Sequence, residues 1–349
     1  MISAFLGAAL ALSLGAGPPL AAGGSLAEAL AQLPPGETLR LGPGEHRGSL
    51  GRLDRPGGVR VEGAGAGLTV ILVPPGEDGA VALGELWLTG LSIVAGPNRS
   101  ALKVLGGAAV LEDVALLGGA AGAFVDGGTL TGHGLVLQGE YGLLLARGEA
   151  RLRDLAARGQ AAGVASMHGA LDLTRAAVTG PSREAAVSVA GGTARLSQVV
   201  LRDPGPTGLA ISGGDVEARD LSVAGAREPR ELGACVLVRR ATLRLSASEL
   251  TRCGGAAVEA SRARVSLDGV DAAGGEVGCL AFTDHSTVDL AATLCTRRGP
   301  GLVAMEGSTV KAFGARFWTD PALWVDCGSG ARVALLGEPA ARQPCAPRR

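Results

Sequence analysis

Aromatic residues are scarce in this chain, at 3% of 349 residues, whereas glycine accounts for 57 of them. Large aromatic side chains contribute much of the core of an ordinary globular domain, so their scarcity argues against such a core. Many glycines with aliphatic residues suit stacked coils, in which small residues form tight turns around a narrow interior. The composition stays constant after the N-terminal segment, which predicts one elongated domain.

An excess of charge of one sign is also missing, because the net charge is -1. This balance gives no electrostatic reason to expect nucleic acid or an anionic membrane as a partner. Beyond the N-terminal segment no apolar run reaches the ~18 residues of a membrane span. We therefore expect no membrane span in the mature protein.

The N-terminal segment has the pattern of an export signal. Residues 4–14 are apolar, and small residues at Ala21 and Ala22 follow two prolines. This predicts a signal peptide over residues 1–22 and a mature domain over 23–349, in a secreted, periplasmic or cell-surface protein. An uncleaved anchor and a mis-assigned start are the alternatives, because the α-amino group is the only positive charge ahead of the apolar run.

A pattern of short strands recurs every 20 to 27 residues from about Ala101 to the C-terminus. Each unit contains three runs with two-residue alternation, separated by a glycine-rich turn and by a short polar corner. Strands this short are not stable alone, but stacked at ~4.8 Å each pairs in parallel with its copies in the neighbouring coils. The repeat predicts an all-β solenoid, a parallel β-helix of about 13 coils and on the order of 60 Å long.

Both ends of such a rod need a cover, because unpaired strand edges invite pairing with other chains. Residues 25–33 form an amphipathic segment with Ser25 as N-cap and Glu28 at the capping-box position,. We expect a short helix there that closes the N-terminal end. The tail 337–349 is expected to cover the last coil.

Two segments carry a resemblance to a known superfamily. Residues 36–48 alternate leucine with polar residues around Gly-Pro-Gly, and residues 59–72 contain a Gly-x-Gly turn. With the preceding helix they resemble the entry coils of the pectate-lyase-like right-handed parallel β-helix superfamily, except that His46 replaces the usual aromatic residue. The resemblance covers residues 25 to about 336 and implies a right-handed helix. It implies no particular activity, because the superfamily includes lyases, hydrolases, epimerases, esterases and non-enzymatic surface proteins.

Two polar patterns are typical of catalytic or metal-binding β-helices. The triplet around His133 resembles the Gly-His-Gly of polygalacturonases, but the aspartates and the Arg-x-Lys that those enzymes need are missing. Asp113, Asp154 and Asp220 share one column immediately before the third strand, where stacked carboxylates would bind calcium as in pectate lyases. Other residue types interrupt that column, and aspartate tolerates the left-handed conformation of a tight corner. We interpret both patterns as turns and predict no catalytic residue, cofactor or metal site, with calcium as the alternative.

Arginines recur on consecutive coils in the C-terminal third. They predict a basic strip for an acidic glycan or a phosphate-bearing surface, and an ordinary solvated face is the alternative. Aromatic side chains often support sugar binding, but those near the C-terminus also suit an end cap. The candidate ligand surface comprises Arg240, Arg262, Arg264 and Trp318.

All six cysteines lie after residue 234. Fifteen pairings are formally available, but the spacings 18, 16 and 18 each correspond to one circuit of a coil, which returns the chain near its start. This predicts three bridges, each worth roughly 3 kcal/mol in the chain-entropy model, and agrees with export; structural free thiols are the alternative. The predicted pairs are Cys235–Cys253, Cys279–Cys295 and Cys327–Cys345.

The sequence therefore favours an exported β-helix with a structural role or a role in binding a polysaccharide or cell-surface component. The alternative is a polysaccharide lyase or glycoside hydrolase acting on an acidic polysaccharide. Its acidic residues would come from Asp268, Asp271 and Asp284. An adhesin or autotransporter passenger is a third hypothesis, weakened because no anchor follows the repeats.

Overall fold

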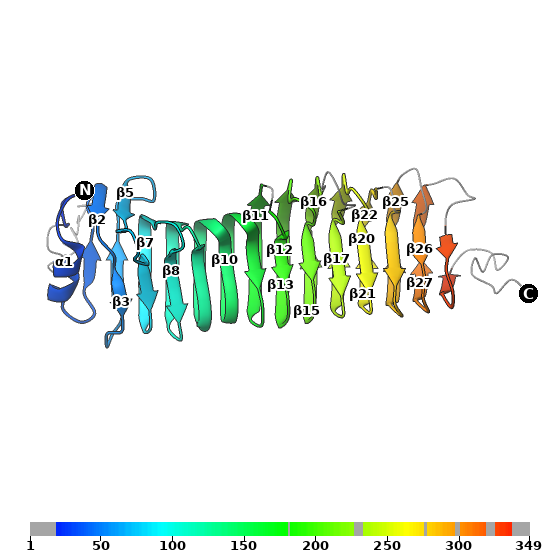
Figure 1. Cartoon of the computed structure of the whole chain (residues 1–349), viewed down its shortest axis with the longest axis horizontal. Coiled ribbons are helices and arrows are strands. Elements are labelled where there is room, and N and C mark those ends of the chain that lie inside the picture. The colour runs from blue at the N-terminus through cyan, green and yellow to red at the C-terminus, as the bar shows by residue number, and fades with distance from the viewer. Residues whose placement is uncertain are drawn as a thin grey trace, which may run out of the picture.

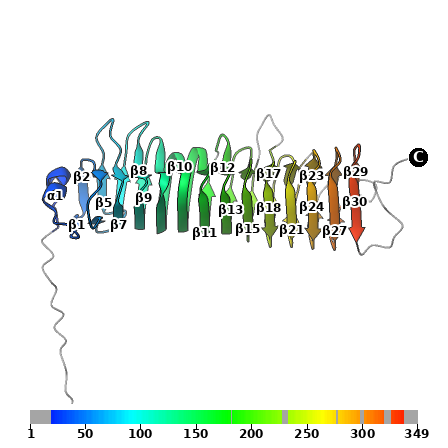
Figure 2. The ribbon, with the colours of Figure 1, turned by 90° about the horizontal axis from the view of Figure 1, so that it is seen from below.

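The computed structural model describes residues 19–180, 182–226, 233–275, 278–296, 301–318 and 325–336. Its 30 strands pair in parallel and form a β-solenoid of about 13 turns, with one short helix. Figure 1 shows the result as a rod in which successive coils lie side by side along the long axis, and Figure 2 shows the same stacking after a quarter turn. The predicted all-β solenoid, its number of coils and its single helix are confirmed.

The strands form three stacks that run along the rod, which we call the first, second and third stacks after the order of the strands in the predicted unit. Each strand pairs in parallel with the equivalent strand of the coil before and the coil after. The first stack contains β3 (Gly51–Leu53), β6 (Ala80–Ala82), β8 (Ser100–Leu105), part of β10 (Ala121–Ser166), β12 (Ala185–Val189), β14 (Leu209–Ile211), β17 (Val236–Arg239), β20 (Val258–Ser261), β23 (Leu280–Thr283), β26 (Leu302–Ala304) and β29 (Val325–Cys327).

The second and third stacks share several long strands. In β7 (Glu85–Val94), β9 (Ala108–Leu117), β10, β11 (Ala170–Thr179) and β13 (Thr193–Arg202) the strand continues through the corner between the two stacks. The second stack also contains β1 (Thr38–Arg40), β4 (Val59–Glu62), β15 (Asp215–Arg219), β18 (Thr242–Ser246), β21 (Arg264–Asp268), β24 (Thr287–Ala291), β27 (Thr309–Phe313) and β30 (Arg332–Leu336). The third stack also contains β2 (Gly44–Arg47), β5 (Thr69–Leu72), β16 (Ser222–Ala224), β19 (Glu249–Thr251), β22 (Asp271–Ala272), β25 (Leu294–Thr296) and β28 (Arg316–Trp318).

The core is a narrow column of aliphatic side chains, because alternate residues of each strand point inward. In the second stack, Leu173, Leu196 and Ala218 are register partners on three successive coils, and each is buried. The inward positions predicted from the repeat are buried, including Leu152 and Leu245.

The corner between the second and third stacks uses the left-handed backbone conformation on coil after coil. The predicted turn aspartates Asp113, Asp154 and Asp220 have φ of 51°, 51° and 53°. The other members of this corner column adopt φ between 44° and 65°, and they are Gly90, Gly134, Arg175, Gln198, Ala247, Gly269, Ala292 and Gly314. The three aspartates therefore adopt the turn conformation that was predicted for this column.

Helix α1 (Leu26–Gln32) covers the N-terminal end of the rod (Figure 1). The Ser25 side chain accepts a hydrogen bond from the backbone N–H of Glu28, as the capping pattern predicted, and Leu26 and Leu30 are buried against the first coils. His46 lies inside the same end of the core, fully buried, with Nε2 2.9 Å from the carbonyl oxygen of Gly42.

Two of the three predicted disulfides are present, Cys235–Cys253 and Cys279–Cys295. Each joins the two ends of one circuit, which is why the 18- and 16-residue spacings predicted them. The third pairing, Cys327–Cys345, and the tail 337–349 extend outside the described residues and stay predictions, as does the signal peptide. None of the helices in the described part of the chain has both the length and the apolar character of a membrane-spanning segment.

Candidate ligand-binding surface

The three arginines predicted as a ligand surface lie around one hollow of about 740 Å³. Arg240 and Arg262 occupy the turn between the first and second stacks on adjacent coils, with φ of 50° and 53°. Arg264 is the first residue of β21. All three side chains are exposed. The repeat therefore places three guanidinium groups beside the N-terminal ends of second-stack strands.

Acidic and hydroxyl groups complete the lining of this hollow. Asp284 lies one coil beyond Arg262, and Asp215 comes from the start of β15. A hydrogen bond of 2.7 Å from the Ser261 hydroxyl, together with one from the carboxyl group of Glu306, holds the pKa of Asp284 below its usual range. Asp284 is therefore ionised at neutral pH and is a weaker base than an ordinary carboxylate.

The positive charges of the hollow are only partly neutralised. Arg262 Nε lies 3.7 Å from Asp284 Oδ2. Arg240 and Arg264 make no ion pair with any residue in the described ranges. Two guanidinium groups thus remain available to an anionic ligand.

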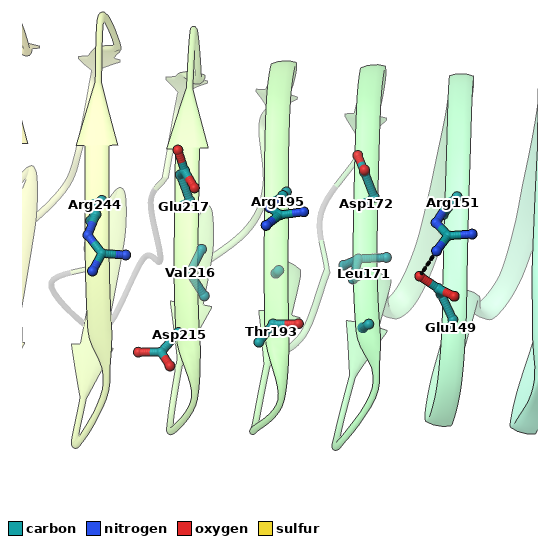
Figure 3. A pocket seen from close by; sticks show the side chains of 12 residues that line it. Glu149, Arg151, Leu171, Asp172, Thr193, Arg195, Asp215, Val216, Glu217 and Arg244 are labelled. Carbon is teal, nitrogen blue, oxygen red and sulfur yellow. Dashed lines mark ion pairs between the residues drawn. The ribbon is translucent and has the colours of Figure 1, made fainter.

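A second hollow of about 260 Å³ lies over the middle of the second stack. Figure 3 shows its charged side chains on five successive coils. One outward position of each strand carries a charge, and the sign alternates from coil to coil, because the register pairs Arg with Asp or Glu at every step. We call this column the charge ladder, and its members are Arg151, Asp172, Arg195, Glu217 and Arg244.

Neighbouring charges of the ladder do not pair with one another. Within the described residues, the one ion pair made by a ladder member joins Arg151 to Glu149 on its own strand (Figure 3). Register partners elsewhere in the second stack do pair, since Arg40 Nε lies 3.3 Å from Glu62 Oε2. The ladder therefore presents charges of alternating sign at the surface, and of its members in the described structure only Arg151 is ion-paired.

The two hollows adjoin, because Asp215 lines both. Together they form one feature of the outer face of the second stack, which we call the charged groove. It reaches from β10 to β24, six pairing steps along the rod. At ~4.8 Å a step the groove is about 29 Å long.

The fourth predicted surface residue does not join this groove. Trp318 ends β28, which belongs to the third stack and pairs with β25. The acidic residues of the alternative enzymatic hypothesis are also dispersed. Asp284 lies at the turn before β24, Asp268 ends β21, and Asp271 begins β22 in the third stack.

The histidines do not converge on one another, although His285 lines the hollow around Arg240 and Arg264. His133 pairs in register with Glu112 in the second stack, and its Nε2 lies 3.5 Å from the Glu112 carboxylate at the surface. His168 and His285 lie in equivalent turns, five pairing steps apart. In the part of the chain that the structure describes, no group of three His, Cys, Asp or Glu side chains converges.

Comparisons with known proteins show the fold and no more. No protein-family model and no curated protein sequence matches the chain. A structure of the catalytic domain of a GH87 α-1,3-glucanase in complex with nigerose is similar, with a TM-score of 0.55, 11% identity, and 92% of this chain and 69% of that chain covered.

Two phage tailspikes are more distant. The tailspike of an Acinetobacter phage has a TM-score of 0.44 at 9% identity over 86% of this chain, and the Dettilon tailspike 0.48 at 10% over 88%. The chain spans 58% and 65% of the length of these two tailspikes.

The sequence predicted the arginines around the first hollow but did not lead to a prediction of the charge ladder. None of the ladder residues was assigned to a site from the sequence. The signal was available in the second strand of each unit, where the position between the two inward residues reads Arg, Asp, Arg, Glu and Arg on five coils.

Proposed function

We propose that this chain is an exported member of the pectate-lyase-like β-helix superfamily that binds an acidic polysaccharide along the charged groove. The observation that carries the proposal is the unpaired state of Arg240 and Arg264 in a hollow that continues into the charge ladder. The solenoid fold, which resembles a glucanase catalytic domain, supports a carbohydrate as the ligand.

The residues of the groove have the chemistry of glycan binding. Guanidinium groups bind carboxylates and sulfates through paired N–H donors. Thr242 and Thr287, which line the same hollow, supply hydroxyls for neutral sugar groups. A groove about 29 Å long suits a polymer with repeated, individually weak contacts.

Binding accounts for the groove better than catalysis does. A lyase needs a base that removes a proton next to a uronate carboxyl group, and a hydrolase needs a second carboxyl group facing the first across the scissile bond. The pKa of Asp284 is lowered, which weakens it as a base. Asp268 and Asp271 lie on other parts of the coil. The carboxyl group of Glu306 is hydrogen-bonded to Asp284, whereas the two carboxyl groups of a glycosidase lie about 5 Å or more apart.

A binding titration with purified protein tests the proposal. Acidic polysaccharides such as hyaluronan and polygalacturonate are compared with a neutral glucan at low and at moderate salt. The variant Arg240→Ala/Arg262→Ala/Arg264→Ala is expected to lose at least tenfold in affinity, because about 1.4 kcal/mol in total is lost with the charge-assisted contacts of the two unpaired guanidinium groups.

A matched control removes three exposed arginines from the third stack. Arg47→Ala/Arg202→Ala/Arg316→Ala changes the net charge equally but leaves the groove intact, so its affinity should stay within a factor of two or three. Equal losses of affinity in the two variants would show that the effect comes from the overall charge and not from the groove. Turnover of either acidic polymer, with or without calcium, would contradict a purely binding function and support the enzymatic alternative.

A further inference from the structure

The charge ladder has a period of two coils, and this period constrains the ligand. Arg151, Arg195 and Arg244 alternate with Asp172 and Glu217 along one column. Charges of like sign are therefore about 9.6 Å apart, twice the ~4.8 Å step between coils. One sugar ring of an extended polysaccharide advances about as far as one coil.

The carboxylates of the ladder are also accessible to a ligand. Glu217 is exposed and Asp172 is half-buried. Neither makes an ion pair with a residue in the described ranges, although each has an arginine as register partner on both sides. At Asp126 and Asp154 the arrangement differs, because Arg147 and Arg175 of the following coil hydrogen-bond their carboxylates at 2.6 Å.

The arginines of the ladder attract negative groups of a ligand and its carboxylates repel them, so both determine which polysaccharide binds. We propose that the charge ladder selects an acidic polysaccharide whose negative charge recurs on every second sugar, with a neutral sugar between. This inference rests on the proposed function and names the substrate class for the same groove.

Each side chain of the ladder interacts favourably with a different sugar of a disaccharide repeat. With a disaccharide repeat, every carboxylate of the glycan lies over an arginine, and each neutral sugar lies over Asp172 or Glu217. The hydroxyl and amide N–H groups of the neutral sugar donate hydrogen bonds to those side chains. A polymer charged on every sugar would also place carboxylates against Asp172 and Glu217, and such like-charge contacts weaken its binding.

The test compares two acidic probes of matched length, hyaluronan oligosaccharides, charged on every second sugar, and oligogalacturonates, charged on every sugar. Hyaluronan is expected to bind about tenfold more tightly, because two exposed like-charge contacts cost about 1.4 kcal/mol together. The variant Asp172→Asn/Glu217→Gln removes the repulsion and keeps the shape. It should bind oligogalacturonate several-fold more tightly without a matching gain for hyaluronan. The ratio of the affinities for hyaluronan and oligogalacturonate should therefore fall towards one.

The matched control removes two carboxylates from adjacent coils of the third stack. Glu249 and Asp271 are exposed register partners there, so Glu249→Gln/Asp271→Asn changes the net charge equally and should leave the ratio near ten. A wild-type ratio near one, or an unchanged ratio in Asp172→Asn/Glu217→Gln, would overturn the inference while the arginine-dependent binding stands. Failure of both probes to bind would overturn the proposed function and the inference together.

Discussion

The corner column between the second and third stacks allows the cost of the left-handed backbone to be measured at two neighbouring positions. Ala247 and Gly269 occupy this corner on adjacent coils, with φ of 47° and 62°. A Cβ atom on Gly269 would lie 3.8 Å from the backbone nitrogen of Ala247, which is an ordinary contact. Replacing either residue by the other type therefore changes the backbone preference and leaves packing almost untouched.

The expected magnitude follows from two opposing terms. The left-handed conformation costs an L-residue about 1–2 kcal/mol, whereas glycine loses about 0.4–1 kcal/mol more than alanine in unfolded-state entropy. Ala247→Gly should therefore raise the free energy of unfolding by about 0.5–1 kcal/mol, the difference between the two terms. Gly269→Ala should lower it by a similar amount.

Chemical denaturation followed by circular dichroism, with the disulfides intact, measures both changes. The matched control is Ala156→Gly at an exposed position of β10 that has an ordinary strand conformation. There the substitution should destabilise by about 0.5–1 kcal/mol, because only the entropic term applies. If Ala247→Gly destabilised as much as the control, or Gly269→Ala were neutral, the strain argument would be refuted.

Two further predictions concern buried polar groups. His46→Phe is expected to raise the free energy of unfolding by about 1 kcal/mol, since it removes the buried Nδ1, which has no hydrogen-bond partner,. The carbonyl oxygen of Gly42, which loses His46, still accepts a hydrogen bond from the Thr69 hydroxyl. A lower free energy of unfolding in chemical denaturation would contradict this prediction. Burial raises the pKa of Asp78, but hydrogen bonds from Lys103 and from the backbone N–H of Ser100 outweigh it and leave the pKa below its usual range. Because the folded-state pKa lies below the unfolded value, this carboxylate stabilises the fold above pH about 4 and loses that contribution as the pH falls. Asp78→Asn should therefore be less stable at neutral pH, with a difference from wild type that shrinks below pH about 4, and a difference independent of pH would count against the ion pair.

The coil geometry was predictable because every coil repeats the same local rules. The inward positions of Leu196 and Leu245 follow from two-residue alternation, and the turn conformation of Asp113 follows from its position at a corner. The two disulfides followed from the same periodicity, because one circuit brings Cys235 back to Cys253. In each case sequence spacing alone fixes which backbone atoms lie close together.

Side-chain pairing was not predictable in this way. Arg40 and Glu62 are 22 residues apart and are register partners that pair at 3.3 Å. Arg195 and Glu217 are also 22 residues apart and are register partners, yet they form no ion pair in the described structure. Equal spacing leads to different contacts because the rotamers depend on the side chains around them, so the sequence could place the ladder but not show that its charges are unpaired.

The distribution of side chains explains why only one face of the rod carries the groove. Over the middle coils, the first stack presents Ser188, Ala210 and Leu237 as outward register partners. The third stack presents Ala156 and Ala177. The first-stack column carries no charge over these coils, and the third-stack column carries none before Glu249, whereas the second stack carries a charged residue at the equivalent position of every coil from β10 to β18. A polymer that follows the rod axis meets one column repeatedly, so the second stack is where an acidic glycan gains an ionic contact at every second step.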